Sequence, residues 1–410
     1  MVYLELFNQL KAVFTQEPDQ LDTGIDDVMI SNFDFESLHY NILPGEDHYF
    51  HPETGEEFQC KYNFQSDVAC PETSEYLNLR DSKLVENRYF RYSVFHSKKQ
   101  KTLSNAIVLF HGFNEKNWDK YLPWAFELHK KTNKAVILFP IAFHMNRAPE
   151  AWSHLRSMQK VRDERKIKYP QIISSSLANV SISVRLQTIP ERYFWSGFQT
   201  YYDVVSLLDG IANGNHPLFD NNSQFDLFSY SIGGFFSEIL LMANPKNYFG
   251  NSKLFIFCGG PVFNRLSPVS KFILDSESNV ALYSFLIEHL ESALKDDERL
   301  EWYLSTDHPE GRYFRCMLNY NKMIGIRESR FKEIGKRILA LGLEKDSVVP
   351  PYEIRNTLKG TSRRLPAKVK IADYPFSYSH EIPFPLMEKN AKSISKAFYS
   401  MINIAGKHLG

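Results

Sequence analysis

Short apolar runs recur along most of the chain and are separated by stretches with helical spacing. They read AIVLF, AVILF, FDLF, LFIF, RILALG and AKVKIA, at residues 106–110, 135–139, 225–228, 254–257, 337–342 and 367–372. Several of these runs are apolar at almost every position, as in a strand that is buried on both faces. A further segment, residues 88–97, alternates apolar and polar positions as a strand does. The pattern therefore predicts a sheet of at least seven strands.

Amphipathic helices are predicted between these strands. Apolar residues recur at three- and four-residue spacing in residues 118–131, 200–211, 232–244, 352–358 and 386–404. Strands that alternate with helices favour a mostly parallel sheet covered by helices on both faces. The predicted fold class is therefore α/β, with a mostly parallel central sheet flanked by helices.

Two long segments do not fit a minimal sheet of this kind. Residues 141–194 and 261–335 lie between predicted strands and hold helical, aromatic-rich sequence. Structureless loops of such length are uncommon in compact domains. We therefore expect both segments to be insertions that form a lid or cap over the main domain.

Charge divides the chain unevenly although its formal net charge is zero. Residues 1–60 hold 13 Asp and Glu and one basic residue, Lys11, so the rest carries 47 basic and 35 acidic residues. We expect residues 1–87 to be an acidic N-terminal extension lying on a basic domain of residues 88–405. A regulatory or partner-binding arm is the alternative.

The composition limits the kinds of partner and the cellular compartment that we expect for this protein. A net charge of zero lacks the excess of basic charge that is typical of nucleic-acid-binding proteins. No apolar run is long enough to span a membrane. The N-terminus lacks the features of a signal peptide. The four cysteines, Cys60, Cys70, Cys258 and Cys316, show no pairing typical of zinc. We expect a cytoplasmic protein with reduced thiols and no metal or organic cofactor.

Candidate chemistry begins at Ser231, in the stretch FSYSIGGFF. It follows a predicted buried strand and precedes a predicted helix, the context of a G-x-S-x-G nucleophile elbow. Ser229 stands where that motif has its first glycine. Because the sharp turn requires small side chains there, Ser229 fits the motif, and Gly233 follows on the other side. The pattern predicts that Ser231 is a nucleophile.

A serine nucleophile needs a general base, and the base needs an orienting acid. Asp346 follows the strand at residues 337–342, and His380 lies between the last strand and the last helix. Both therefore fall in loops after strands, in the order serine, acid, histidine. Glu344 and Asp373 are alternative candidates for the acid.

The segment HGF follows the strand at residues 106–110, where an oxyanion-binding loop belongs. Gly112 would let the backbone approach the substrate closely. The backbone N–H groups of Phe113 and Ile232 would then bind a developing oxyanion. We expect His111 to support the loop without transferring a proton.

With these motifs (HGF, SYSIGG, LEKDSVVP and SYSHEIP) the chain resembles the α/β-hydrolases of the serine-nucleophile type over residues 88–405, the two insertions excepted. The resemblance implies an α/β-hydrolase fold and a triad of Ser231, Asp346 and His380. It also implies an oxyanion hole formed by the backbone of Gly112, Phe113 and Ile232. It further implies hydrolysis of a carboxylic ester of a small-molecule acyl substrate through an acyl-enzyme, without a cofactor. An amidase or peptidase of the same fold, and a non-catalytic hydrolase-like binding protein, are the alternatives.

Three further residues are candidates for substrate binding. His144, Asn146 and Arg147 follow the strand at residues 135–139, and Arg147 could bind a carboxylate. The alternative is that they only begin the first insertion. Cys258 also follows a strand, but we expect it to be a buried structural cysteine.

Overall fold

The computed structural model describes residues 2–60, 77 and 80–410. In these residues nine strands form one sheet, in the order β1-β2-β3-β5-β4-β6-β7-β8-β9. The strands β5, β4, β6, β7, β8 and β9 run parallel to one another. The pairs β1–β2, β2–β3 and β3–β5 are antiparallel. Their bounds are β1 (Gln20–Asp22), β2 (Val28–Glu36), β3 (Tyr89–Ser97), β4 (Leu103–Phe110), β5 (Ala135–Leu138), β6 (Phe219–Tyr230), β7 (Leu254–Phe257), β8 (Ile338–Leu343) and β9 (Lys368–Ala372).

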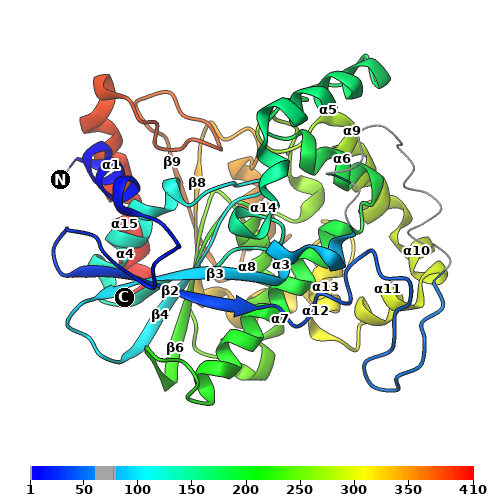
Figure 1. Cartoon of the computed structure of the whole chain (residues 1–410), viewed down its shortest axis with the longest axis horizontal. Helices are drawn as coiled ribbons and strands as arrows, with labels where there is room; N and C mark the ends of the chain where they lie inside the picture. The colour runs from blue at the N-terminus through cyan, green and yellow to red at the C-terminus, as the bar shows by residue number, and fades with distance from the viewer. Residues whose placement is uncertain (1, 61–76, 78–79) are drawn as a thin grey trace.

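Helices cover both faces of the sheet (Figure 1). On β4, Ile107 and Leu109 face one core, whereas Ala106 and Val108 face the other. This alternation is what a strand buried on both faces requires. The first core is closed by α1 (Tyr3–Val13), α4 (Leu122–Thr132) and α15 (Ala391–Leu409), and the second by α7 (Arg192–Ala212), α8 (Ile232–Ala243) and α14 (Pro351–Lys359).

The predicted α/β-hydrolase fold is confirmed, with each predicted strand present. Among the strands, the largest difference in bounds is at β6, which begins at Phe219 and not at residue 225. Its first half is polar and largely exposed, so an apolar run could not reveal it. The last helix begins at Ala391, five residues after its predicted start.

The N-terminal segment is not a separate extension. β2 pairs with β3 along its full length, and α1 packs in the same core as α4 and α15. The expected boundary at residues 87 and 88 is therefore wrong, because the described part of residues 2–60 completes the sheet and its core. The single domain thus begins at α1.

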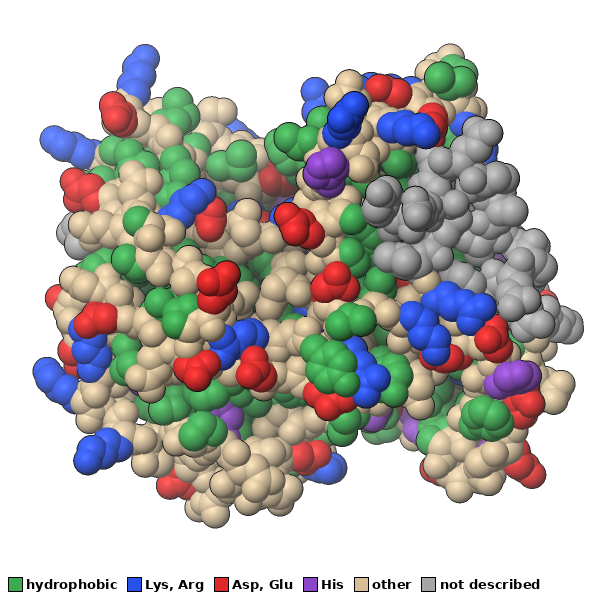
Figure 2. All heavy atoms as spheres, in the orientation of Figure 1, with side chains coloured by type: hydrophobic (Ala, Val, Ile, Leu, Met, Phe, Trp, Pro, Cys, Tyr) green, Lys and Arg blue, Asp and Glu red, His purple; other side chains and the backbone are tan. Residues whose placement is uncertain are grey.

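Several acidic side chains of this segment form ion pairs with basic side chains of the rest of the chain. Asp34 lies 2.9 Å from Arg91, Asp22 lies 2.6 Å from Lys98, and Glu36 pairs with Arg88 on β3. Figure 2 accordingly shows acidic and basic side chains interspersed on the face that carries β2 and β3. The segment therefore lies on the basic body as a fixed part of the fold.

The two insertions pack against each other. Arg165 on α5 donates two hydrogen bonds, of 2.6 and 2.8 Å, to Asp275, which also caps α9. Both side chains are buried, so the pair joins the two segments firmly. The helices of these segments and their surroundings are α3 (Val85–Arg88), α5 (Leu155–Lys168), α6 (Val180–Thr188), α9 (Ser276–Tyr283), the π-helix η7 (Ser284–His289), α10 (Leu290–Asp296), α11 (Glu298–Tyr303), α12 (Pro309–Cys316) and α13 (Ile324–Ile334).

Candidate active site

Ser231 lies at the sharp turn between β6 and α8. Its φ of 55° and ψ of −120° are outside the regions that serine ordinarily adopts. Such a backbone is what a nucleophile elbow requires. A Cβ on Gly233 would lie 2.8 Å from the carbonyl oxygens of Phe110 and His111, so only glycine fits there. The turn therefore presents the Ser231 hydroxyl at the end of the sheet.

Ser229 fits the turn through a hydrogen bond that the sequence did not reveal. Its side chain is fully buried, and its Oγ is bonded to Ser237 Oγ on α8. A buried hydroxyl needs such a partner. The serine at the expected glycine position is thus accommodated by a second serine two helical turns away.

A chain of two hydrogen bonds joins the three residues named as a triad. Ser231 Oγ lies 2.7 Å from His380 Nε2, and His380 Nδ1 lies 2.7 Å from Asp346 Oδ2. The three residues are 8%, 3% and 4% exposed, respectively. The structure therefore brings Ser231, His380 and Asp346 together in one buried network.

Asp346 is held by more than His380. Its Oδ1 accepts hydrogen bonds from the backbone N–H groups of Val348, at 3.0 Å, and Val349, at 2.8 Å. Burial raises the pKa of the nearby Cys258 thiol, and the charge of Asp346 adds to this shift. Cys258 is buried and unpaired, as expected, and it contacts the network from the neighbouring strand.

The alternative acids do not contact His380. Asp373 accepts a hydrogen bond from Tyr378 and pairs with Lys345, at 3.0 Å, on the exposed side of the loop. Its pKa is lowered by these two contacts, first by Lys345. Glu344 is exposed. Asp346 is therefore the carboxylate that the structure brings to His380.

Tyr230, which precedes the serine, also positions His380. Its ring stacks on the His380 ring with centroids 5.5 Å apart, and its hydroxyl donates to the His380 backbone carbonyl. Tyr230 was not among the candidates predicted from the sequence. The signal that could have identified it was its position directly before the candidate nucleophile, with its side chain on the opposite face of the strand.

The HGF segment is fixed by His111. His111 Nε2 accepts from the Ile141 N–H at 2.9 Å, so Nδ1 carries the proton and donates to the Gly112 carbonyl at 2.7 Å. Burial lowers the pKa of His111 to about 3, so its ring is neutral at pH 7. Because the carbonyl and N–H of a trans peptide point in opposite directions, the Phe113 N–H points away from His111.

The three backbone groups expected at the oxyanion site differ in their availability. The Gly112 N–H donates to the Tyr121 hydroxyl at 2.8 Å, so it is engaged elsewhere. The N–H groups of Phe113 and Ile232 donate to none of the described residues, and both residues line the cavity at Ser231. Phe113 and Ile232 therefore fit the expected role, whereas Gly112 does not serve as a donor.

The three candidate substrate-binding residues lie in different surroundings in the structure, and only one of them lines a cavity. His144 lines a cavity beside Phe113. Asn146 donates to the Arg91 carbonyl at 2.8 Å, outside either of the cavities near Ser231. Arg147 is fully buried against Asp203 at 2.7 Å and also bonds to Asn87. The expectation that Arg147 binds a substrate carboxylate is therefore wrong, because its guanidinium is already paired in the core.

This buried pair predicts a large effect on stability. Asp203→Ala should lower the free energy of unfolding by about 3–5 kcal/mol, because it leaves the Arg147 charge buried without a counter-charge. Asp209→Ala is the matched control on the same helix, since its ion pair with Lys246 is largely exposed. We expect it to cost about 1 kcal/mol or less. Urea denaturation of both variants measures the difference, and equal losses would contradict the prediction.

A predominantly apolar cavity of about 530 Å³ lies over Ser231, and we call it the serine chamber. Its floor includes Ser231 and Gly259, and its roof includes Ile273, Leu274 and Leu282 from the second insertion. An apolar, water-poor site of this kind strengthens electrostatic interactions inside it. The chamber is suited to an uncharged substrate group.

The part of the chain that the structure describes has neither a metal-binding cluster nor a membrane-spanning helix. There, no group of three His, Cys, Asp or Glu side chains is arranged to hold a metal ion. No described helix has the length and apolarity needed to cross a membrane. Cys60, Cys258 and Cys316 are free thiols, and Cys70 lies outside the described residues.

Comparisons with known proteins give a family and distant structural likenesses. Residues 1–410 match a family described as "Family of unknown function (DUF6051)". No curated protein sequence matches the chain. A carboxyl esterase from the fungus Tuber melanosporum is 11% identical, with a TM-score of 0.44 over 78% of this chain and 81% of that one. A thermostable esterase from Pseudomonas putida is 10% identical, with a TM-score of 0.41 over 99% and 88%.

Proposed function

The chain belongs to the DUF6051 family, a family of unknown function, and we propose that it is a serine hydrolase that cleaves a carboxylic ester through an acyl-enzyme. The observation that carries the proposal is the continuous hydrogen-bonded chain from Ser231 through His380 to Asp346. It begins at a strained serine between a strand and a helix, on the floor of an apolar chamber. Each of these features is what nucleophilic catalysis by serine requires.

In the first step Ser231 Oγ attacks the ester carbonyl carbon while His380 Nε2 takes the hydroxyl proton. Asp346 accepts the hydrogen bond of His380 Nδ1–H and so stabilises the imidazolium that forms. His380 then gives its proton to the leaving alkoxide, which departs as the alcohol. Water, activated by the same histidine, attacks the acyl-enzyme and releases the carboxylic acid and the free serine.

The oxyanion of each tetrahedral intermediate is bound by backbone N–H groups. Phe113 and Ile232 supply them, because both residues lie at the serine and donate to none of the described residues. Ile232 also begins α8, whose N-terminal end carries a partial positive charge. One such donor is worth about 3 kcal/mol of transition-state stabilisation.

The two insertions act as the cap that excludes water from this chemistry. Asn114, next to the HGF segment, donates to the carbonyls of Ala178 at 2.9 Å and Phe272 at 2.7 Å, one in each insertion. Ser270 donates to Glu381, beside His380, at 2.6 Å. The cap is thus anchored both to the oxyanion loop and to the histidine loop.

A fluorophosphonate probe tests the proposed chemistry directly. Ser231 Oγ should displace fluoride from phosphorus, and peptide mass spectrometry should find the adduct on Ser231. A panel of uncharged esters, amides and peptides then identifies the acyl compound that is hydrolysed. Absence of the adduct would overturn the proposal in favour of a binding protein, whereas turnover of amides or peptides alone would replace esterase by amidase or peptidase.

A further inference from the structure

A second cavity, of about 650 Å³, adjoins the serine chamber behind the HGF segment. The two cavities share Phe113, Tyr193, Ile232 and Phe235 in their walls, so they lie side by side next to Ser231. We call the second cavity the aromatic chamber because six-membered rings form most of its wall. Those rings belong to Phe113, Tyr193, Phe194, Phe198, Tyr201, Phe235, Phe236 and Phe314.

Two buried polar atoms in this wall have no partner among the described residues. They are Nε2 of His144 and the hydroxyl of Tyr193, whose residues are 5% and 8% exposed. Buried polar groups are almost always hydrogen-bonded, so each such atom calls for an explanation. Both residues line the same chamber, which indicates that a ligand supplies the missing partner.

The protonation of His144 defines what that partner must be. Its Nδ1 lies 2.9 Å from the Ala142 carbonyl, which can only accept, so Nδ1 carries the proton. Burial lowers the pKa of His144 to about 3, and the ring is therefore neutral. Nε2 is left as a lone-pair acceptor on a residue that lines the predominantly apolar chamber. It requires an O–H or N–H donor from the ligand.

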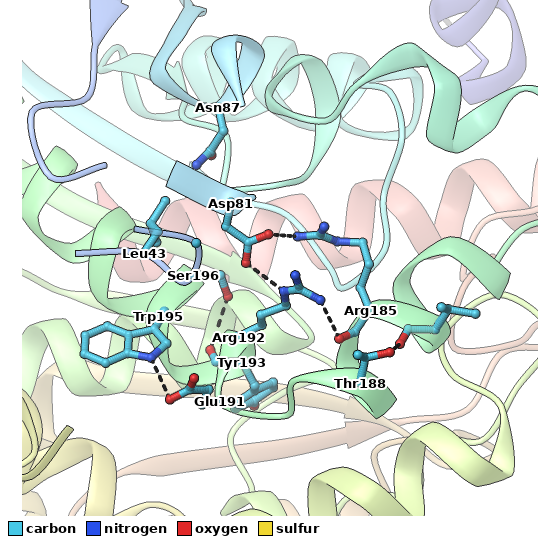
Figure 3. Close-up of polar contacts among 12 residues, drawn as sticks. Leu43, Asp81, Asn87, Arg185, Thr188, Glu191, Arg192, Tyr193, Trp195 and Ser196 are labelled. Atoms are coloured by element: carbon cyan, nitrogen blue, oxygen red, sulfur yellow. Dashed lines mark hydrogen bonds and ion pairs between the residues drawn. The ribbon is translucent and has the colours of Figure 1, made fainter. Parts of the chain in front are cut away.

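Both groups are held in place before any ligand binds. The His144 ring packs between those of His111, 5.2 Å away, and Phe113, 5.4 Å away. Tyr193 follows Arg192 at the start of α7. Figure 3 shows Asp81 between the guanidinium groups of Arg185 and Arg192, each 2.7 Å from its carboxylate. This buried cluster fixes the helix end and thus the position of Tyr193.

The charge of the chamber lining excludes an anionic ligand. Of its lining residues Glu310 is acidic, and its carboxylate already accepts from Tyr202 at 2.6 Å. The lining includes no Lys or Arg that could balance an anion. An anionic group would therefore be desolvated without a counter-charge.

We propose that the aromatic chamber binds the arm of the ester substrate that carries a hydroxyl group on a ring-containing skeleton without an anionic group. This inference rests on the proposed hydrolase function. The ligand hydroxyl donates to His144 Nε2 and accepts from the Tyr193 hydroxyl, while the rings of the wall pack on its skeleton. The substrate class is thus an ester of a hydroxylated aromatic or alicyclic compound.

Matched esters test the inference. One pair is 2-phenylethyl butyrate and its 3-hydroxyphenyl analogue, and the other is butyl 3-phenylpropanoate and its 3-hydroxyphenyl analogue, because either arm of the ester can occupy the chamber. In at least one pair we expect the kcat/KM of the hydroxylated ester to be about 10–100-fold higher than that of its unsubstituted analogue. The reason is that an ester without the hydroxyl group leaves the buried polar groups of the chamber unpaired. Equal values in both pairs would overturn the inference.

Variants assign the preference to the two residues. His144→Phe should abolish the preference for the hydroxylated ester, and Tyr193→Phe, which removes a single oxygen, should reduce it several-fold. Tyr202→Phe is the matched control on the same helix, because its hydroxyl already bonds to Glu310, and it should keep the preference. A preference that survives both His144→Phe and Tyr193→Phe would contradict the assignment. If His144→Phe does not fold, Tyr193→Phe decides.

The failure of this inference is distinguishable from that of the proposed function. Labelling of Ser231 together with hydrolysis of both members of each pair at equal rates would leave the hydrolase and remove the hydroxyl site. Absence of labelling would remove the hydrolase. Calorimetric binding of 2-phenylethanol and its 3-hydroxyphenyl analogue to the wild-type protein then still decides the hydroxyl site, because binding needs no catalysis. Equal affinities would overturn it.

Discussion

Ser231→Ala should lower kcat for ester hydrolysis by about 10⁵–10⁶-fold, because it removes the atom that forms the acyl-enzyme. The fold should be unaffected, since the Ser231 side chain bonds only to His380 among the described residues. Hydrolysis of the best ester from the panel measures kcat, and thermal unfolding checks the fold. The fluorophosphonate adduct should disappear in the same variant.

The companion variant His380→Ala should cost a similar factor, since an unactivated serine is a weak nucleophile. The double variant should be no slower than either single one, because residues that act as a unit are strongly non-additive. Losses that multiply in the double variant would contradict a shared role. A Ser231→Ala protein that retains a tenth of wild-type kcat would remove Ser231 from catalysis.

The parallel core of the fold and the order of the candidate triad could be predicted because both are local features. Strands buried on both faces produce continuous apolar runs, and the residues after parallel strands meet at one edge of the sheet. Ser231, Asp346 and His380 could therefore be placed at one edge from their positions after strands alone. The antiparallel strand β2 was missed because Asp34 and Glu36 give it the charge of a surface segment, and their partners lie on β3.

Pairings across long sequence separations could not be predicted. Arg147 follows a strand, as a substrate-binding residue often does, but its partner Asp203 is 56 residues away. Nothing in the sequence distinguishes Asp203 from other acidic residues in helices. Tyr193 was likewise indistinguishable from a core aromatic residue, because its hydroxyl is exceptional only through the absence of a partner among the described residues.

Asp346→Asn should lower kcat by about 10⁴-fold, through the tautomer of His380 and not through a loss of packing. The side-chain oxygen of the new amide must face the N–H groups of Val348 and Val349, which can only donate. Its NH₂ group then faces His380 Nδ1, where Asp346 now accepts a hydrogen bond. His380 would be forced to carry its proton on Nε2, where it can no longer take the proton of Ser231.

Asp373→Asn is the matched control, seven residues from His380 but bonded to Tyr378 and Lys345 on the exposed side. It should change kcat by less than about 3-fold, since it touches no member of the network. The rate of fluorophosphonate labelling separates a tautomer effect from unfolding: it should fall with kcat in Asp346→Asn while the unfolding temperature stays close to that of wild type. If Asp346→Asn keeps more than a tenth of wild-type kcat, or if Asp373→Asn costs as much, Asp346 is not the residue that orients the histidine.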